Sequence, residues 1–112
     1  MESSSELLPR YRATARRGHA EPELVLKAAR DDRIPGEEIA NLSATYAEDH
    51  GWTPPAGGTR DFVIGHALTA GWRPERIAET FGVTPVTVES ARERLDALTR
   101  ARYASESRPR AF

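Results

Sequence analysis

The stretch IAETFGVTPVTV, residues 77–88, decides the fold of this chain. Gly82 separates two short segments, and glycine suits the corner between two helices because it tolerates positive φ. Thr84 followed by Pro85 is typical of the start of a helix. Ala78 is small enough to let two steeply crossing helices approach closely. The stretch therefore predicts one helix that ends at Gly82 and another that begins at Thr84.

These residues resemble the helix-turn-helix of bacterial and phage regulators, including the forms in sigma-factor region four and in LuxR-type and MerR-type proteins. That pattern has a small residue, a glycine four positions later, an apolar residue next, and a β-branched residue ten positions after the first. Its positions are occupied here by Ala78, Gly82, Val83 and Val88. The resemblance implies a trihelical DNA-binding domain, with Val83 and Val88 filling the angle between the crossing helices and the last helix entering the major groove.

Three helices are expected within residues 59–100. Thr59 is a candidate cap of the first helix, which Gly71 ends. Pro74 begins the second helix, and the third extends from Thr84 to about Arg100. At about 100° per residue, the third helix has one apolar side for the core. That side is formed by Val88, Ala91, Leu95 and Leu98.

The resemblance also implies which side chains meet DNA. Predicted base contacts are Thr84, Val86, Thr87, Glu89, Ser90 and Glu93. Predicted phosphate contacts are Arg73, Arg76, Arg92 and Arg94. The two glutamates in the first set would repel phosphate. This leaves two functions open: a sequence-specific transcriptional regulator acting as a homodimer on double-stranded DNA, and an adaptor or accessory protein that uses the fold for protein contact, either polymerase-associated or in phage packaging.

The rest of the chain divides by composition and by turn residues. Residues 1–20 are predicted to form a flexible basic arm, and residues 101–112 a flexible tail. Residues 21–51 are predicted to form an acidic pair of helices, for which packing on the last three helices and contact with a dimer or protein partner remain alternatives. Residues 52–58 carry two prolines and three glycine or alanine residues, and are expected to form a loop. The fold class is all-α, with about five helices, a C-terminal trihelical core and no wing.

Composition argues against several other classes. The chain has no cysteine, so disulfides and thiolate metal sites are excluded. It has no apolar run of the roughly 20 residues that a membrane span needs. His19, His50 and His66 lack ligand spacing, and the sequence shows no credible arrangement of a nucleophile with a base. We therefore expect a soluble cytoplasmic protein that is not an enzyme and has no metal, cofactor or membrane partner.

Overall fold

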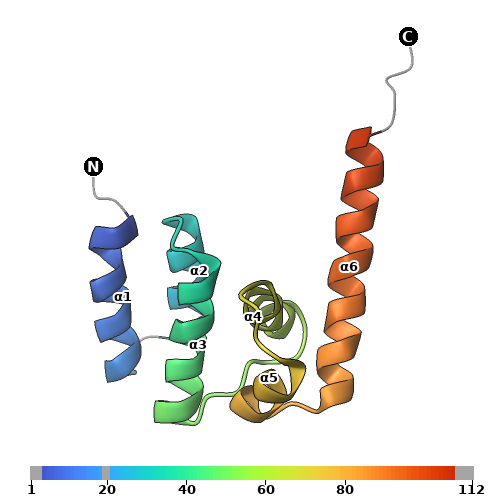
Figure 1. Cartoon of the computed structure of the whole chain (residues 1–112). Coiled ribbons are helices and arrows are strands. Elements are labelled where there is room, and N and C mark those ends of the chain that lie inside the picture. The colour runs from blue at the N-terminus through green and yellow to red at the C-terminus, as the bar shows by residue number, and fades with distance from the viewer. Residues whose placement is uncertain (1–3, 19–20, 108–112) are drawn as a thin grey trace.

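Figure 1 shows the computed structural model of the chain, which describes residues 4–18 and 21–107. These residues form six helices and no strand. The helices are α1 Ser4–Arg17, α2 Pro22–Asp31, α3 Gly36–His50, α4 Gly58–Thr69, α5 Pro74–Phe81 and α6 Pro85–Ser107. The all-α class is confirmed, with one helix more than the sequence predicted. None of the described helices has both the length and the hydropathy to cross a membrane.

The additional helix is α1, and it corrects the prediction of a flexible arm over residues 1–20. Leu7, Leu8, Tyr11 and Ala15 recur at helical spacing and face the rest of the molecule, where Ala15 is fully buried. Pro9 falls inside α1 without ending it. Residues 1–3 and 19–20 of the predicted arm lie outside the described residues. The arm is thus a helix that packs on α2 and α3.

Side-chain contacts also attach α1 to its neighbours. The hydroxyl of Tyr11 donates a hydrogen bond to Asp32, just after α2. Burial and this neighbouring carboxylate raise the pKa of Tyr11 to about 12. Arg12 forms an ion pair with Glu38 of α3, with a nitrogen–oxygen distance of 2.9 Å. These contacts tie both α2 and α3 to the first helix.

Helix α3 is the centre of the fold, because it packs against α1, α2, α4 and α5. Its inward side chains Ile39, Leu42 and Tyr46 are almost completely buried. Glu37 and Glu38 stand in its first turn, where the helix dipole favours negative charge. Helix α3 therefore packs on the C-terminal helices, while contact of the acidic helices with a dimer or protein partner stays a prediction.

Helix α6 packs on α4 and α5 only through its first half. Val88 and Ala91 are fully buried, and Leu95 is half-buried beside Gly65 of α4. Farther along, the helix projects past the other elements (Figure 1), and the side chains of Leu98 and Tyr103 are 67% and 71% exposed. The prediction that Leu98 belongs to the core is wrong, because the helices that cover Val88 do not extend that far.

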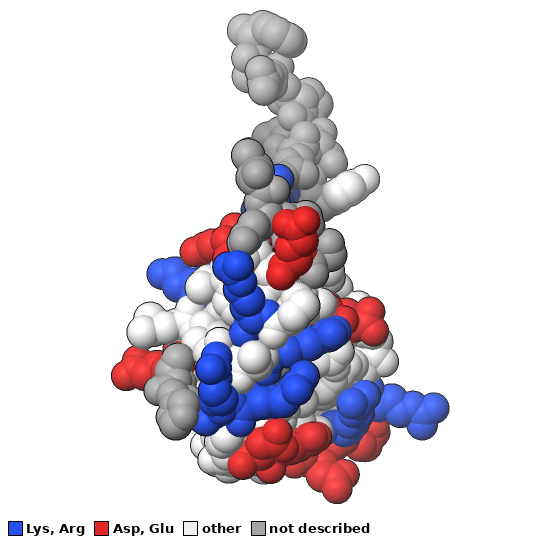
Figure 2. Space-filling model, turned by 90° about the vertical axis from the view of Figure 1, so that its left-hand side faces the viewer, with Lys and Arg blue, Asp and Glu red and all other residues white. Residues whose placement is uncertain are grey.

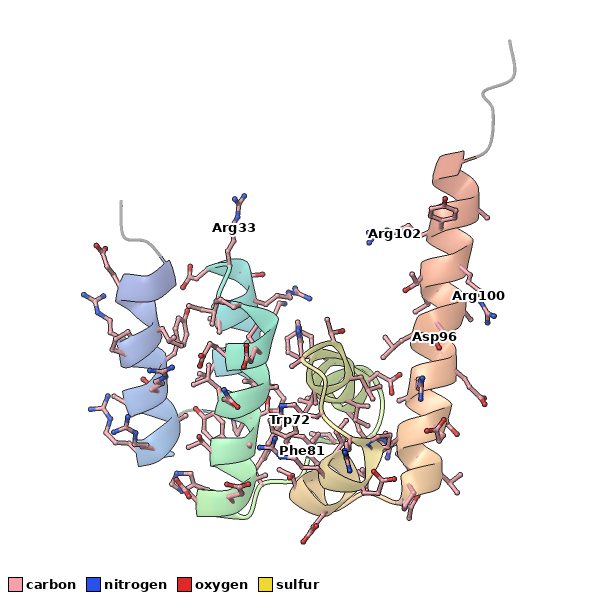
Figure 3. All side chains as sticks on the ribbon, in the orientation of Figure 1. Arg33, Trp72, Phe81, Asp96, Arg100 and Arg102 are labelled. Atoms are coloured by element: carbon pink, nitrogen blue, oxygen red, sulfur yellow. The ribbon has the colours of Figure 1, made fainter. Side chains whose placement is uncertain are left out.

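The end of α6 also differs from the prediction. Residues 101–107, expected in a flexible tail, continue the helix to Ser107. The remaining predicted tail residues, 108–112, lie outside the described residues. In this projecting part, Arg100 and Arg102 extend to opposite sides of the helix (Figure 3).

Candidate nucleic-acid interface

The corner between α5 and α6 is built by three adjacent residues. Gly82 has φ 66° and ψ 33°, the left-handed conformation that its sequence position predicts. The backbone N–H of Val83 donates to the carbonyl oxygen of Ala78 at 3.0 Å, which satisfies a carbonyl at the end of α5. Thr84 then begins α6. The chain therefore turns within the residues from Phe81 to Thr84.

The start of α6 is fixed by two threonine hydroxyls. The backbone N–H of Thr87 donates to Oγ1 of Thr84 at 3.1 Å, as expected for a capping residue. The two hydroxyl oxygens also lie 2.9 Å apart in a hydrogen bond. Both threonines were predicted to contact bases, and both already hold the first turn of the helix.

The inner and outer sides of α6 are clearly different. Val88 and Ala91 are fully buried on the inner side, and Ala78 of α5 is also buried. We call the opposite side the α6 outer face, defined by Val86, Glu89, Ser90 and Glu93. Its members are exposed, except Ser90, which is half-buried. The side chain of Val86 is 74% exposed.

Arg76 on α5 is held by an aromatic stack. Its guanidinium carbon lies 3.8 Å from the ring centroid of Trp72, a cation–π contact. Trp72 in turn stacks on Phe81, with centroids 6.1 Å apart and an angle of 10° between the rings. Figure 3 shows both rings at the base of the molecule, beside α5. The stack holds the exposed side chain of Arg76 above a rigid core, so less conformational entropy is lost when it binds an anion.

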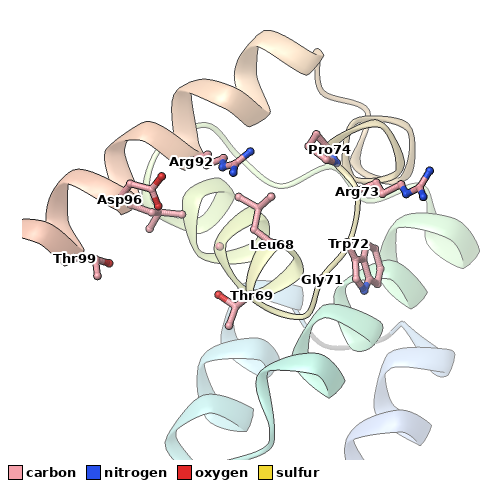
Figure 4. A pocket seen from close by; sticks show the side chains of 11 residues that line it. Leu68, Thr69, Gly71, Trp72, Arg73, Pro74, Arg92, Asp96 and Thr99 are labelled. Carbon is pink, nitrogen blue, oxygen red and sulfur yellow. The ribbon is translucent and has the colours of Figure 1, made fainter.

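A groove of about 480 Å³ runs between α4, the turn before α5 and α6. Figure 4 shows Arg92 projecting from α6 toward this turn, with Asp96 beside it, while Arg73 points away from α6. Arg92 is also within 3.8 Å of Glu89 one turn earlier. An exposed ion pair of this length is weak, so Arg92 remains able to exchange Glu89 for another anion.

Arg94 has a partner within the chain. Its Nε and one terminal nitrogen donate to the two carboxylate oxygens of Asp61, on α4, at 3.1 and 2.8 Å. Hydrogen bonding from Arg94 lowers the pKa of Asp61, and the same bond raises that of Arg94. Arg94 thus joins α6 to α4, whereas the sequence suggested a phosphate contact.

The charge around the corner is close to neutral. Three of the predicted phosphate-binding arginines, Arg73, Arg76 and Arg92, are exposed. Exposed acidic side chains on α5 and α6 include Glu75, Glu79, Glu89, Glu93 and Asp96. This surface can offer hydrogen bonds and a protruding helix, but it does not have the excess positive charge of a strong nonspecific DNA-binding surface.

Sequence reasoning did not identify the aromatic stack under Arg76 or the partner of Arg94. Trp72 lies four residues before Arg76, a spacing that places side chains together on a helix, but Trp72 precedes α5 and so gave no helical signal. Asp61 and Arg94 are far apart in the sequence. Comparisons of the chain with known protein families, with curated proteins and with solved structures find no match.

Proposed function

We propose that this chain is a sequence-specific DNA-binding protein, a transcriptional regulator that acts as a homodimer through a helix-turn-helix formed by α5 and α6. The observation that carries the proposal is the Gly82 corner, after which α6 has a buried inner side and an exposed outer face. An exposed α-helix of this kind fits the width of the major groove.

Three residues of the α6 outer face have a specific role in this proposal. Val86 contacts the methyl group of a thymine, and Ser90 forms a hydrogen bond with a base or phosphate. Glu89 accepts a hydrogen bond from the amino group of a cytosine, which is a favourable partner for a negatively charged carboxylate. Arg73, Arg76 and Arg92 bind the phosphates on either side of the groove, and these contacts fix the position of α6.

The homodimer compensates for the weak charge of a single interface. Two copies related by a two-fold axis would bind two half-sites, and the energies of the two contacts would combine. The projecting part of α6 offers Leu98 and Tyr103 for this contact between copies. Sedimentation of the parent protein and of Leu98→Asp tests the dimer, which is rejected if both sediment as monomers at the concentrations that bind DNA.

Selection of bound genomic fragments, followed by mobility-shift titration, tests the function itself. Ser90→Ala should cost about 1–3 kcal/mol against the selected site and little against unrelated DNA, because it removes a base contact. Arg76→Ala should weaken binding to all sequences alike and lower the salt slope by about one. Thr45→Ala and Arg33→Ala are the matched controls, since Thr45 is half-buried as Ser90 is, Arg33 is exposed, and neither residue belongs to α5 or α6. If Ser90→Ala and Arg76→Ala both bind as the parent does, the interface is wrong.

The four glutamates around the α5–α6 corner, Glu75, Glu79, Glu89 and Glu93, favour a second candidate, an adaptor that uses the same surface to bind another protein. Regulation requires that binding to DNA fall steeply as salt rises and that one sequence recur among the selected fragments. An adaptor would retain no DNA at low salt and would form a complex of fixed stoichiometry with one protein partner.

A further inference from the structure

We propose that α1 carries a second nucleic-acid-binding surface, which holds the phosphate backbone of a duplex other than the one at α6. We call this surface the α1 outer face. It consists of Arg10, Arg12, Arg16 and Arg17. That α1 binds a duplex is independent of the proposed function, whereas the joining of two duplexes rests on it.

The arginines lie together because of the helical period of α1. At about 100° per residue, Arg10, Arg16 and Arg17 fall on the side of the helix away from Leu7, Leu8, Tyr11 and Ala15, which pack on the core. Arg12 stands at the edge of this face, where it pairs with Glu38 of α3. All four are exposed. Figure 2, which views the molecule from the α1 side, shows Lys and Arg gathered across the middle of this surface, with acidic side chains toward its edges.

The last turn of α1 presents the most accessible charges. Within the described ranges, no ion pair or side-chain hydrogen bond engages the guanidinium groups of Arg16 and Arg17. His50 fixes this turn, because its Nε2 donates to the carbonyl oxygens of Ala15 and Arg16, both at 2.9 Å. Gly18 lies directly against the ring of His50, where a Cβ atom would be only 2.6 Å from it. The two arginines therefore extend from a well-anchored helix end.

The chemistry of this surface favours a nucleic-acid backbone over a protein. Protein interfaces have an apolar centre, and the large exposed apolar side chains of the described residues, Leu24, Val86, Leu98 and Tyr103, are all on other helices. The planar guanidinium group matches phosphate oxygens in bidentate contacts. An anionic membrane fits less well, because insertion requires a free apolar face and that of α1 is packed on the core.

The position of α1 determines what this binding would accomplish. Helices α1 and α6 lie at opposite sides of the molecule, with α2–α5 between them (Figure 1). The α1 outer face points away from α6, so a straight duplex bound at one end does not reach the other. One protein molecule would then hold two duplex segments, one by sequence through α6 and one by backbone charge through α1.

A bead assay tests this inference with the full chain. A duplex carrying the site selected by the parent is fixed to beads, protein is added, and a fluorescent duplex of random sequence is supplied. We expect the parent to retain the fluorescent duplex, and Arg16→Gln with Arg17→Gln to retain at least about tenfold less, with a salt slope lower by about two. The matched control changes Lys27 and Arg33 to Gln, which removes the same charge from exposed positions outside α1.

A third variant, Arg73→Gln with Arg76→Gln, distinguishes the two proposals. If it still binds the random duplex in solution and the Arg16/Arg17 variant does not, α1 is the second surface whether or not α6 recognises a sequence. If the Arg16/Arg17 variant joins duplexes as well as the parent, the inference is overturned. It is equally overturned if the Lys27/Arg33 control loses as much binding, because the effect would then be one of net charge.

Circular dichroism of each variant should match that of the parent, since all the changed side chains are exposed.

Discussion

The helices at the two ends of the molecule expose very different surfaces. The α1 outer face carries arginines and no large apolar side chain, whereas α6 exposes Val86, Leu98 and Tyr103 among charges of both signs. Their attachment differs too. Helix α6 packs on α4 and α5, while α1 packs mainly on α2 and α3. The comparison indicates that α6 is suited to selective contacts and α1 to charge alone, and that α1 can be perturbed without disturbing α6.

The largest effect tests the core that supports the α5–α6 corner. Phe81→Ala should lower the free energy of unfolding by about 3–5 kcal/mol, because Phe81 is fully buried and stacks on Trp72. Urea denaturation followed by circular dichroism measures the change. Leu8→Ala in α1 is the counterpart, and it should cost clearly less because Leu8 is only half-buried. Equal losses from the two variants would contradict the difference in attachment.

The next effect concerns the conformation of the corner itself. Gly82→Val should cost about 1–3 kcal/mol, because a β-branched residue is strained at a φ of 66°. The space around the glycine is adequate, since an added Cβ would lie 3.4 Å from Thr53. Thermal unfolding measures the loss. Gly58→Ala, in the first turn of α4 and in open space, should leave the melting temperature nearly unchanged. An unchanged melting temperature for Gly82→Val would argue against the corner.

A smaller, local effect is expected where α1 is anchored. His50→Ala should cost about 1 kcal/mol, because two carbonyl oxygens at the end of α1 lose their donor. Hydrogen exchange should become faster in α1 and stay unchanged in α5 and α6. Asp49→Ala, at the neighbouring exposed position, is the control. Faster exchange throughout the chain would show that α1 and α6 unfold together and would remove the basis of the comparison.

The smallest effect comes from the ion pair between α4 and α6. Because Arg94 lowers the pKa of Asp61 below its usual 3.8, the pair stabilises the fold above that pH, and this contribution is lost as pH falls through the lowered pKa. Asp61→Asn should therefore melt slightly below the parent at neutral pH, and the difference should vanish in acid. The exposure of the pair keeps the effect near the limit of detection. A difference that grows on acidification would contradict this origin.

The corner could be predicted from sequence because its signals are local. Gly82, Thr84 and Pro85 each favour one backbone conformation through their own chemistry, and these conformations occur where the sequence places them. The first and last residues of α5 were likewise marked by proline and glycine. Neither the DNA contacts nor the dimer follows from these local signals, and both remain predictions.

The missed features depend on contacts between distant residues. Helix α1 has a short apolar stripe with a proline, Pro9, nearby in the sequence, and the partners of that stripe lie on α2 and α3. Leu98 has the same helical phase as Ala91, but a helical projection cannot tell where the covering helix stops. The pairing of Arg94 with Asp61 likewise required the crossing of α4 and α6. Periodicity thus identified which side of a helix is apolar but not how far along the helix that side is covered.

The uninterrupted course of α6 has a mechanical consequence. A helix of 23 residues is about 35 Å long and has no hinge where it leaves the core. A partner that binds at Tyr103 therefore acts on the same continuous helix that carries Val86 and Glu89. A twist or shift imposed at the free end would be transmitted along the helix to Val86 and Glu89, so occupancy at one end would affect the orientation available at the other.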